Sequence, residues 1–319
     1  MRPSQTELTT QSRPVVVLAG GVGAARMIRA LSGVMPASDI TAIVNVGDDF
    51  CLHGLSISPD LDTITYTLAG ANNDDLGWGL KGETWAAMDA LQRYGGETWF
   101  GLGDRDLATH LYRSERISQG ATLSQVTSEI TSAWHIRQHL LPMSDDPVRT
   151  MLQSEGQLGE LSFQEYFVKH RHSVPIRSVR FDGATEAAAA PGVVEAITEA
   201  ERIIVAPSNP IVSIAPLLAL DSLRTALEQR REDIVAVSPL IGGKALKGPA
   251  DRLMRELGLT SNAVGVAELY KSWVGKIVID EADSDSLGSI KALGVQVEAT
   301  RTVMSDPGVA QSLSEVVLR

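Results

Sequence analysis

The chain has 319 residues, of which 44% are hydrophobic and 21% charged, and its formal net charge is −11. This length and balance suit a globular protein with a sizeable core. An acidic chain repels nucleic-acid phosphates and anionic lipids, which argues against general binding to either. The sequence contains no run of eighteen consecutive apolar residues, so no transmembrane helix is predicted. A single cysteine, Cys51, excludes an intrachain disulfide and favours a reducing cytoplasm.

The N-terminal part of the chain predicts the start of a layered α/β fold. Residues 1–13 are polar, without the apolar core of a secretory signal, and we expect them to be disordered. PVVVLAG at 14–20 is typical of a strand buried on both faces of a parallel sheet. Glycines and a helical apolar pattern follow, and residues 40–46 predict a second buried strand. This order opens a doubly wound α/β fold.

The remaining elements repeat this alternation. Short apolar runs at 201–207, 233–239, 276–283 and 295–300 predict strands, with helical stretches between them. The predicted class is therefore α/β, with a Rossmann-like, doubly wound and mainly parallel sheet. Residues 105–175 look different, and we expect a mostly helical insertion or cap there. Residues 14–319 would then form a single α/β domain carrying that insertion.

The glycine loop AGGVGAAR at 19–26 is the first candidate ligand site. Gly20, Gly21 and Gly23 would let the backbone approach a ligand, and the N–H groups of the following helix start could receive phosphate oxygens. The loop is neither a Walker A motif nor a dinucleotide fingerprint. A plain tight turn between strand and helix is the alternative.

Aspartates gather after the second predicted strand. Between Leu31 and Leu80 there are seven Asp and no Lys or Arg. Carboxylates at the end of a parallel strand lie where α/β proteins bind ligands, and oxygen ligands suit Mg²⁺. The alternative is that these residues make Asx turns and cap a helix. The candidate metal ligands are Asp48, Asp49, Asp60 and Asp62.

Three later loops carry further candidate binding residues. LGDRDLATH at 102–110 holds an arginine that could bind a phosphate, or could instead pair with a helix-capping aspartate. Two loops follow predicted strands. The first, PSNP at 207–210, could hydrogen-bond a nucleotide, and the second, SPLIGGKALKGPA at 238–250, could bind an anion. Turn chemistry and solvated lysines are the alternatives. These candidates are Asp104, Arg105, Ser208, Asn209, Gly242, Gly243 and Lys247.

Taken together, these strings resemble one enzyme family. AGGVGAARMIRAL, NVGDD, ISPDLDT, LGDRDLATH, PMSDDPV, FQEYFV, PSNPIVSIAP, SPLIGGKALKGPA and GVAELY occur in the order seen in the 2-phospho-L-lactate transferase family of deazaflavin coenzyme F-420 biosynthesis. The resemblance covers nearly the whole chain from residue 14. It is strongest to the actinobacterial branch, whose members are described as phosphoenolpyruvate transferases.

The resemblance implies a Mg²⁺-dependent phosphotransferase. The acceptor would be 7,8-didemethyl-8-hydroxy-5-deazariboflavin (Fo), and the donor a guanosine diphosphate ester of lactate or enolpyruvate. The ribityl hydroxyl of Fo would attack the β-phosphorus, releasing GMP. Small molecules would be the ligands, and a homodimer is expected. Residue type alone does not decide between lactate and enolpyruvate.

The residues themselves, together with this resemblance, give a hypothesis for the role of each candidate. Asp48, Asp49, Asp60 and Asp62 would include the Mg²⁺ ligands, with Asp49 and Asp62 as the catalytic candidates. The acceptor side would be formed by Asp62, Asp104 and Arg105. The donor side would be formed by Gly20, Gly21, Gly23, Ser208, Asn209, Gly242, Gly243 and Lys247. The alternative function is a nucleotide-sugar-binding regulatory protein, because a second family shares the core fold, the glycine loop and the NVGDD-like segment.

Overall fold

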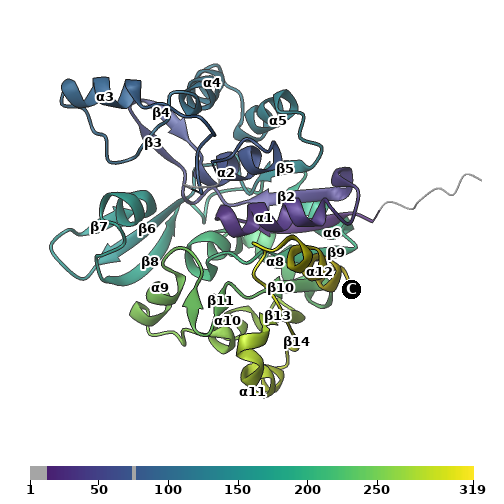
Figure 1. Ribbon diagram of the computed structural model, residues 1–319. Helices are drawn as coiled ribbons and strands as arrows, with labels where there is room; N and C mark the ends of the chain where they lie inside the picture. Colours follow the sequence, from purple (N-terminus) through teal and green to yellow (C-terminus); the bar gives the residue numbers. More distant parts are fainter. Residues whose placement is uncertain (1–12, 74–76) are drawn as a thin grey trace, which may run out of the picture.

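A parallel sheet forms the centre of the molecule in the computed structural model, which describes residues 13–73 and 77–319 (Figure 1). All but one of the residues expected to form a disordered lead, 1–13, therefore lie outside the described part. Within that part, the central sheet is wholly parallel. Its seven strands, in spatial order, are β14 (Gln296–Thr300), β13 (Lys276–Asp280), β10 (Ile234–Val237), β9 (Arg202–Val205), β1 (Val15–Ala19), β2 (Ile40–Val44) and β5 (His139–Pro142).

This sheet confirms the predicted α/β class and its doubly wound topology. Strands β1, β9 and β10 consist of buried apolar residues apart from a half-buried Arg202, as expected for strands covered on both faces. From β1, the chain adds β2 and β5 on one side of the sheet. It then adds β9, β10, β13 and β14 on the other side. Because such crossovers are right-handed, their helices cover opposite faces of the sheet. The reversal between β1 and β9 is where open α/β sheets bind ligands.

The helices pack in two groups around the sheet (Figure 1). One group consists of α1 (Gly21–Leu31), α2 (Pro59–Leu68) and α12 (Pro307–Leu318), where α1 contacts both of the others. A second group consists of α6 (Val193–Glu199), α7 (Ala215–Leu218) and α8 (Asp221–Gln229). The C-terminal part adds α9 (Ala250–Glu256), α10 (Ala263–Tyr270), α11 (Leu287–Ala292) and the hairpin of β11 (Leu240–Ile241) with β12 (Lys244–Ala245).

The expectation of a mostly helical insertion over residues 105–175 is correct only for its first part. Helices α4 (Asp106–Ser118) and α5 (Leu123–Ala133) are followed by β5, which extends the central sheet. The chain then forms a separate antiparallel sheet of β6 (Arg149–Ser154), β7 (Glu160–Ser162) and β8 (Ile176–Asp182). In β6 every second residue is buried, which is the period of a strand with one face covered.

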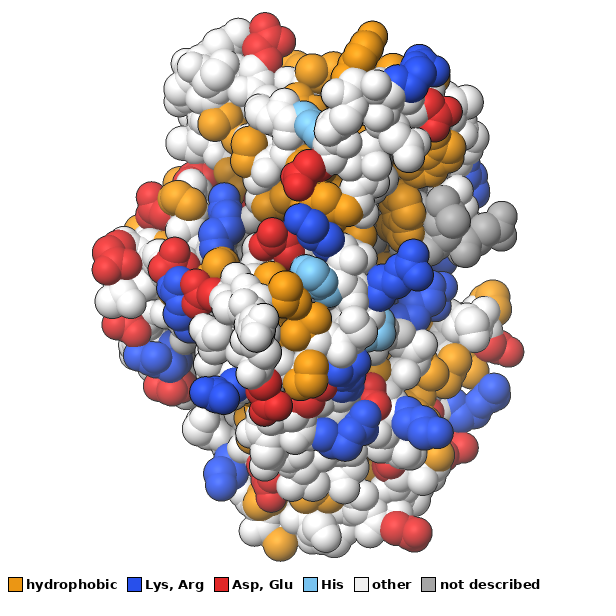
Figure 2. Space-filling view, turned by 90° about the vertical axis from the view of Figure 1, so that its left-hand side faces the viewer, with side chains coloured by type: hydrophobic (Ala, Val, Ile, Leu, Met, Phe, Trp, Pro, Cys, Tyr) orange, Lys and Arg blue, Asp and Glu red, His pale blue; other side chains and the backbone are white. Residues whose placement is uncertain are grey.

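Two arms project from the carboxyl edge of the central sheet (Figure 1). The first arm comprises the hairpin of β3 (Phe50–Leu52) and β4 (Leu55–Ile57) with α3 (Ala86–Arg93), and it has its own hydrophobic cluster. The second arm is the β7-β6-β8 sheet with the π-helical turn Glu165–Lys169. Figure 2 shows hydrophobic side chains gathered on this face of the molecule, below its uppermost part.

Short turns complete the chain. A π-helical turn spans Pro210–Ile214, and 3₁₀ turns span Ala37–Asp39, Arg231–Asp233 and Glu281–Ser286. Among the described residues, no single helix is long and apolar enough to cross a bilayer. In the same part of the chain, only one bent pair of helical stretches reaches the length and hydropathy of a membrane span. The pair consists of Pro210–Leu218 and Asp221–Gln229, which meet at an angle of 92°.

Candidate active site

A cavity of about 630 Å³ opens at the carboxyl edge of the sheet, between the two arms and the C-terminal half. Its lining comes from the glycine loop after β1, the segment after β2, the start of α2, and the loops after β9, β10 and β14. These segments are distant in the sequence but meet because parallel strands end at the same edge. The volume lies within the range of small-molecule and cofactor sites.

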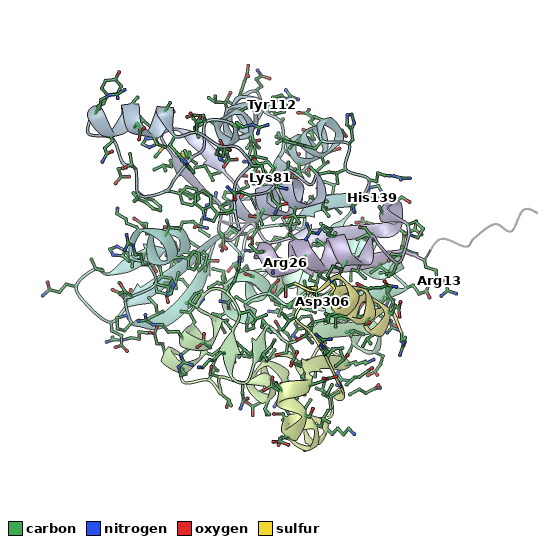
Figure 3. All side chains as sticks on the ribbon, viewed as in Figure 1. Arg13, Arg26, Lys81, Tyr112, His139 and Asp306 are labelled. Atoms are coloured by element: carbon green, nitrogen blue, oxygen red, sulfur yellow. The ribbon has the colours of Figure 1, made fainter. Side chains whose placement is uncertain are left out.

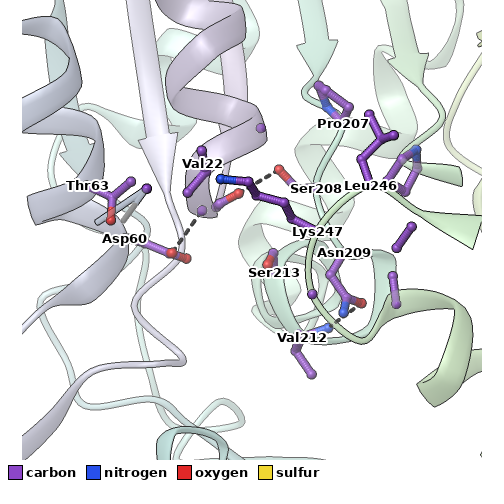
Figure 4. Close-up of a pocket in the computed structure, with 18 of the residues that line it drawn as sticks. Val22, Asp60, Thr63, Pro207, Ser208, Asn209, Val212, Ser213, Leu246 and Lys247 are labelled. Carbon is purple, nitrogen blue, oxygen red and sulfur yellow. Dashed lines mark hydrogen bonds between the residues drawn. The ribbon is translucent and has the colours of Figure 1, made fainter. Parts of the chain in front are cut away.

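The start of α1 is held by a carboxylate of the protein itself. Gly21 N donates to Asp60 Oδ1 at 2.8 Å (Figure 4). Asn45 Nδ2 donates to Asp60 Oδ2 at 3.0 Å. Asp60 therefore ties the N-terminus of α2 to the glycine loop, while also lining the cavity. One N–H group that the sequence assigned to phosphate binding is already occupied by this side chain.

The glycines allow the loop to pack closely against its neighbours. A Cβ atom on Gly20 would lie 2.6 Å from Ser213 Cβ, and one on Gly23 would lie 2.3 Å from the backbone oxygen of Pro207. Gly21 has a φ of +70°, which favours glycine. The loop after β9 is joined to this turn, because Ser208 Oγ donates to Gly20 O at 2.8 Å (Figure 4).

Asn209 combines a structural and a ligand-facing group. Its Oδ1 accepts from Ile211 N at 2.9 Å, which starts the π-helical turn Pro210–Ile214. Its Nδ2 is buried and has no hydrogen-bond partner among the described residues. Asn209 lines the cavity, so this free donor is available to a bound molecule. π-Helical turns of this kind occur frequently at functional sites.

Asp48 and Asp49 form an acidic cluster with Asp60 at the end of β2. Burial, followed by the charge of Asp60, raises the pKa of Asp48 well above its usual range. Burial raises the pKa of Asp49 to about 7, and that of Asp60 to about 6. Arg149 and Arg113 act in the opposite direction on Asp49, but burial outweighs their charge, so all three carboxylates keep raised pKa values. A bound cation would supply further positive charge and reverse the shift.

The donor atoms of this cluster fit a hard divalent cation. Asp48 Oδ1 and Asp49 Oδ1 are buried without a hydrogen-bond partner among the described residues. Asp48 lines both the main cavity and a smaller hollow of about 70 Å³, which Asp49 also lines. Over residues 13–73 and 77–319, no three or more acidic, His or Cys side chains are placed to hold a metal. A Mg²⁺ ion usually needs only one or two carboxylates, with substrate phosphates and waters completing its shell.

Asp62 lies apart from the cavity lining, in a buried charge network. Arg113 donates to both of its carboxylate oxygens, at 3.1 Å from Nη1 to Oδ2 and more closely from Nη2 to Oδ1. His110 lies between Asp62 and Asp106, at 3.7 Å and 3.3 Å. Tyr66 Oη donates to Asp106 Oδ1 at 2.5 Å. Although burial acts in the opposite direction, His110, Tyr66 and Arg113 keep the pKa of Asp106 below its usual range.

Asp104 and Arg105 also lie outside the cavity lining. Asp104 accepts hydrogen bonds from Ala86 N and Ala87 N at 3.0 and 2.9 Å, so its carboxylate holds the start of α3. The hydrogen bond from the Thr84 hydroxyl, and then those from Ala87 N and Ala86 N, lower the pKa of Asp104. Arg105 Nη1 donates to Lys81 O at 2.5 Å, and its backbone N donates to Glu83. In this structure the two residues join the loop before α3 to the start of α4.

Only some of the residues predicted to bind an anion in the loop after β10 line the cavity. Lys247 lines the cavity and extends toward the glycine loop near Val22 (Figure 4). Gly242 and Gly243 are not among the lining residues; Gly242 N donates to both oxygens of Asp283 at 3.1 Å. Both glycines have positive φ values, 56° and 74°, and shape the turn that carries Lys247.

Aromatic side chains form two walls that sequence reasoning did not identify. Trp78 and Phe100 line the cavity from the side of the first arm, and Phe163 and Phe167 from the second arm. The rings of Phe163 and Phe167 are stacked, with centroids 5.4 Å apart and an interplanar angle of 8°. The spacing Phe-x-x-x-Phe in FQEYFV was the available signal, since residues four apart share a helical face.

Lys169 connects the two arms beside these walls. Its Nζ lies 3.6 Å from Glu97 Oε1 and 5.6 Å from the centre of the Trp99 ring. Glu97 and Trp99 belong to the segment that leads from α3 to Phe100, whereas Lys169 ends the π-helical turn of the second arm. Arg26, on α1, is a further lining residue that the sequence reading passed over (Figure 3).

Comparison with known proteins shows the family to which this chain belongs. The model of the family described as 2-phospho-L-lactate transferase CofD matches residues 15–317. A phosphoenolpyruvate transferase of Streptomyces coelicolor is 43% identical over 296 residues, covering 92% of this chain and 93% of that protein. One of Mycolicibacterium smegmatis is 40% identical over 307 residues, covering 92% of this chain and 94% of that protein.

A solved structure supports the fold. A Bacillus halodurans member of the UPF0052 family superposes with a TM-score of 0.63 at 17% identity, covering 97% of this chain and all of that chain. At this identity the likeness concerns the fold alone. The family match and the relatives together extend over almost the whole chain, including every segment that lines the cavity. The protein therefore belongs to the 2-phospho-L-lactate transferase CofD family.

Proposed function

We propose that this protein transfers a 2-hydroxy-acid phosphate, either phosphoenolpyruvate or 2-phospholactate, from a guanosine diphosphate donor to the ribityl hydroxyl of Fo, in coenzyme F-420 biosynthesis. Its curated relatives carry the name phosphoenolpyruvate transferase, which favours the enolpyruvyl donor. The observation that carries the proposal is a single cavity that combines buried carboxylates, a glycine loop and aromatic walls. These groups suit a metal-assisted reaction between a diphosphate ester and a flat heteroaromatic acceptor.

The donor would occupy the part of the cavity formed by the loops after β1, β9 and β10. Asn209 Nδ2 offers an unused hydrogen-bond donor there, and Lys247 offers a positive charge close to the glycine loop. Asp60 already accepts from Gly21 N. The remaining contacts to the diphosphate would therefore come from these side chains more than from the α1 N-terminus.

The acceptor would lie between the two arms. Phe163 and Phe167 present stacked rings on one side, and Trp78 and Phe100 lie on the other. A deazaflavin ring system is flat and apolar enough to pack between aromatic walls. Its ribityl chain would then extend toward Asp48, which lines the same cavity. Asp104 and Arg105 would act on the acceptor side indirectly, by positioning the loop before α3.

The reaction is a substitution at phosphorus. The ribityl oxygen forms a bond to the β-phosphorus, and the bond from that phosphorus to the oxygen bridging to the α-phosphate breaks. The electron pair leaves with GMP, and the hydroxyl proton passes to a carboxylate. Asp48 is suited to accept it through the carboxylate oxygen that does not ligate the ion, because its side chain lines the cavity. Alignment of the two substrates supplies much of the acceleration.

Mg²⁺ fits the acidic cluster by the chemistry of its donors. Asp48 and Asp49 would hold the ion through their unpartnered oxygens, with Asp60 completing the acidic wall of the cavity. When bound, Mg²⁺ would neutralise charge on the phosphate oxygens. Asp62 remains a less direct contributor in this proposal, since Arg113 already binds both of its carboxylate oxygens.

Reconstitution tests the proposal directly. The purified protein is mixed with Fo, Mg²⁺ and either the enolpyruvyl or the lactyl diphosphoguanosine donor, and products are separated by chromatography with mass detection. The expected result is an Fo phosphodiester and GMP in equal amounts, with one donor turned over faster. Saturable Fo binding without product from either donor would contradict the transfer reaction. Saturable binding of a nucleotide sugar, without binding of Fo, would support the regulatory alternative.

Two further expectations remain predictions. The resemblance favours a homodimer, and the single cysteine of the sequence favours a reducing cytoplasm. Light scattering coupled to gel filtration would give the mass in solution. A mass equal to one chain, 34.1 kDa, at micromolar concentration would rule out a stable dimer.

A further inference from the structure

Arg26 lines the cavity from the second turn of α1, whereas Asp60 lines it from the start of α2. Asp60 contacts Gly21 N, at the first residue of α1. Gly23 faces the loop after β9, since a Cβ on it would meet Pro207 O. Arg26 is three residues further along the same helix, so it shares that face. Arg26 lines the same cavity as Pro207, Ser238 and Thr302.

This arginine is half-buried and has no polar partner in the described part of the chain. Across residues 13–73 and 77–319, no hydrogen bond or ion pair involves its guanidinium, although it lines the cavity. Comparable half-buried arginines in this chain are bonded: Arg230 donates to Ile197 O and Ala200 O, and Arg252 pairs with Glu256. A partly desolvated guanidinium without an acceptor is well placed to bind an anionic ligand.

We infer that Arg26 binds the phosphate of the departing nucleoside monophosphate. This inference rests on the proposed function and adds a residue that neither the resemblance nor the sequence motifs singled out. Lys247 extends toward Val22 and the start of α1 (Figure 4), and its ammonium lies beside Gly77. Arg26, one turn along α1, lies beyond Val22, where the nucleotide half of a diphosphate ester would extend.

The role has a chemical reason. As the bond between the β-phosphorus and the bridging oxygen breaks, negative charge grows on the phosphate that leaves with the nucleoside. A guanidinium offers several N–H donors in a plane that matches phosphate oxygens. It stabilises this developing charge more than the charge of the bound donor. Arg26 would therefore contribute to turnover as well as to donor binding.

The test uses GMP itself, titrated calorimetrically into the full-length protein. Arg26→Ala and Arg26→Gln are compared with the wild type and with Arg29→Ala. Arg29 is on the same helix but is exposed and is not among the cavity-lining residues. Loss of a charge-assisted contact is expected to weaken GMP binding by about tenfold to a hundredfold. Arg29→Ala should bind GMP within about twofold of the wild type.

Separate readouts distinguish the possible failures. Fo binding, followed by fluorescence, and the thermal midpoint are measured for every variant and should match the wild type. GMP affinity that is unchanged in both Arg26 variants would overturn the inference and leave the proposed transfer intact. Equal losses of GMP and Fo binding would also overturn it, by showing a general effect on the fold. A wild-type protein that binds neither GMP nor GDP would instead contradict the proposed function.

Discussion

Arg113 donates to both carboxylate oxygens of Asp62, and both side chains are almost completely buried, at 3% and 8% exposure. The pair joins α4 to α2, which begins directly before Asp60. Although burial opposes it, the charge of Asp62 keeps the pKa of Arg113 above its usual value. Asp62 is thus neutralised within the protein, and its main effect on the cavity is through the placement of α2.

Removal of Arg113 is expected to destabilise the fold strongly. Arg113→Leu leaves the Asp62 carboxylate buried without its partner, which typically costs about 3–5 kcal/mol. The double variant Arg113→Leu, Asp62→Asn removes both charges and should recover a large part of that loss. Urea unfolding followed by tryptophan fluorescence measures the difference. Strictly additive losses in the two single variants and the double variant would show that the pair does not act as a unit.

Asp48→Asn is expected to impair metal-dependent turnover without disturbing the nucleotide side of the cavity. The substitution removes an unpartnered carboxylate oxygen at the acidic cluster, so transfer should fall by at least about a hundredfold. GMP affinity in the presence of EDTA should stay within about twofold of the wild type. Turnover is measured over a range of Mg²⁺ concentrations, with Asp89→Asn, on the exposed side of α3, as the matched control. Wild-type turnover in Asp48→Asn would exclude it as a ligand or proton acceptor.

The glycine loop gives a steric prediction with an internal control. Gly23→Ala places a methyl group 2.3 Å from Pro207 O, so either the loop after β9 or α1 must move. We expect a loss of about 1–3 kcal/mol in the free energy of unfolding, together with weaker GMP binding. Gly288→Ala, in α11, meets open space and should stabilise the helix by about 0.5–1 kcal/mol. If both variants unfold at the same denaturant concentration, the close approach at Gly23 has no energetic consequence.

The aromatic walls give a prediction about the acceptor. Phe167→Ala removes one ring of the stacked pair from the cavity wall and should raise the dissociation constant of Fo by about tenfold. GMP affinity should not change, because the ring lies on the second arm. Tyr94→Ala is the control, since Tyr94 is 84% exposed and does not line the cavity. Fluorescence titration of Fo measures both variants, and equal dissociation constants would place the deazaflavin elsewhere.

The central sheet was predictable because its strands are short apolar runs covered on both faces. β5, with the sequence HLLP, has too few residues for such a run and was hidden between helical and polar segments. The sequence of β6 does not show a clear alternation of polar and apolar residues, because the polar residues Thr150 and Ser154 occupy buried positions. Antiparallel pairing with distant partners, not local pattern, fixes these strands.

The site was predictable where it follows from topology. Residues that come directly after parallel strands, such as Asp48, Ser208 and Asn209, do meet in one cavity. Contacts made by helical side chains across long sequence separations could not be foreseen, and Arg113 with Asp62 is an example. Asp104 was assigned to the acceptor because of its motif, but in the structure it binds the start of α3. Arg26 was overlooked because it follows the glycines as an ordinary helical residue.

The order of the strands also has a consequence for biosynthesis. The acidic cluster and the glycine loop belong to the first quarter of the chain, whereas Asn209 and Lys247 follow β9 and β10. On a ribosome, β1 therefore waits for its neighbour β9 while roughly 180 residues are still being added, which takes about 10–40 seconds at typical elongation rates. During that interval one edge of β1 stays unpaired and the cluster has no opposing wall. A nascent chain would become able to bind nucleotide only after β9 and β10 have left the exit tunnel.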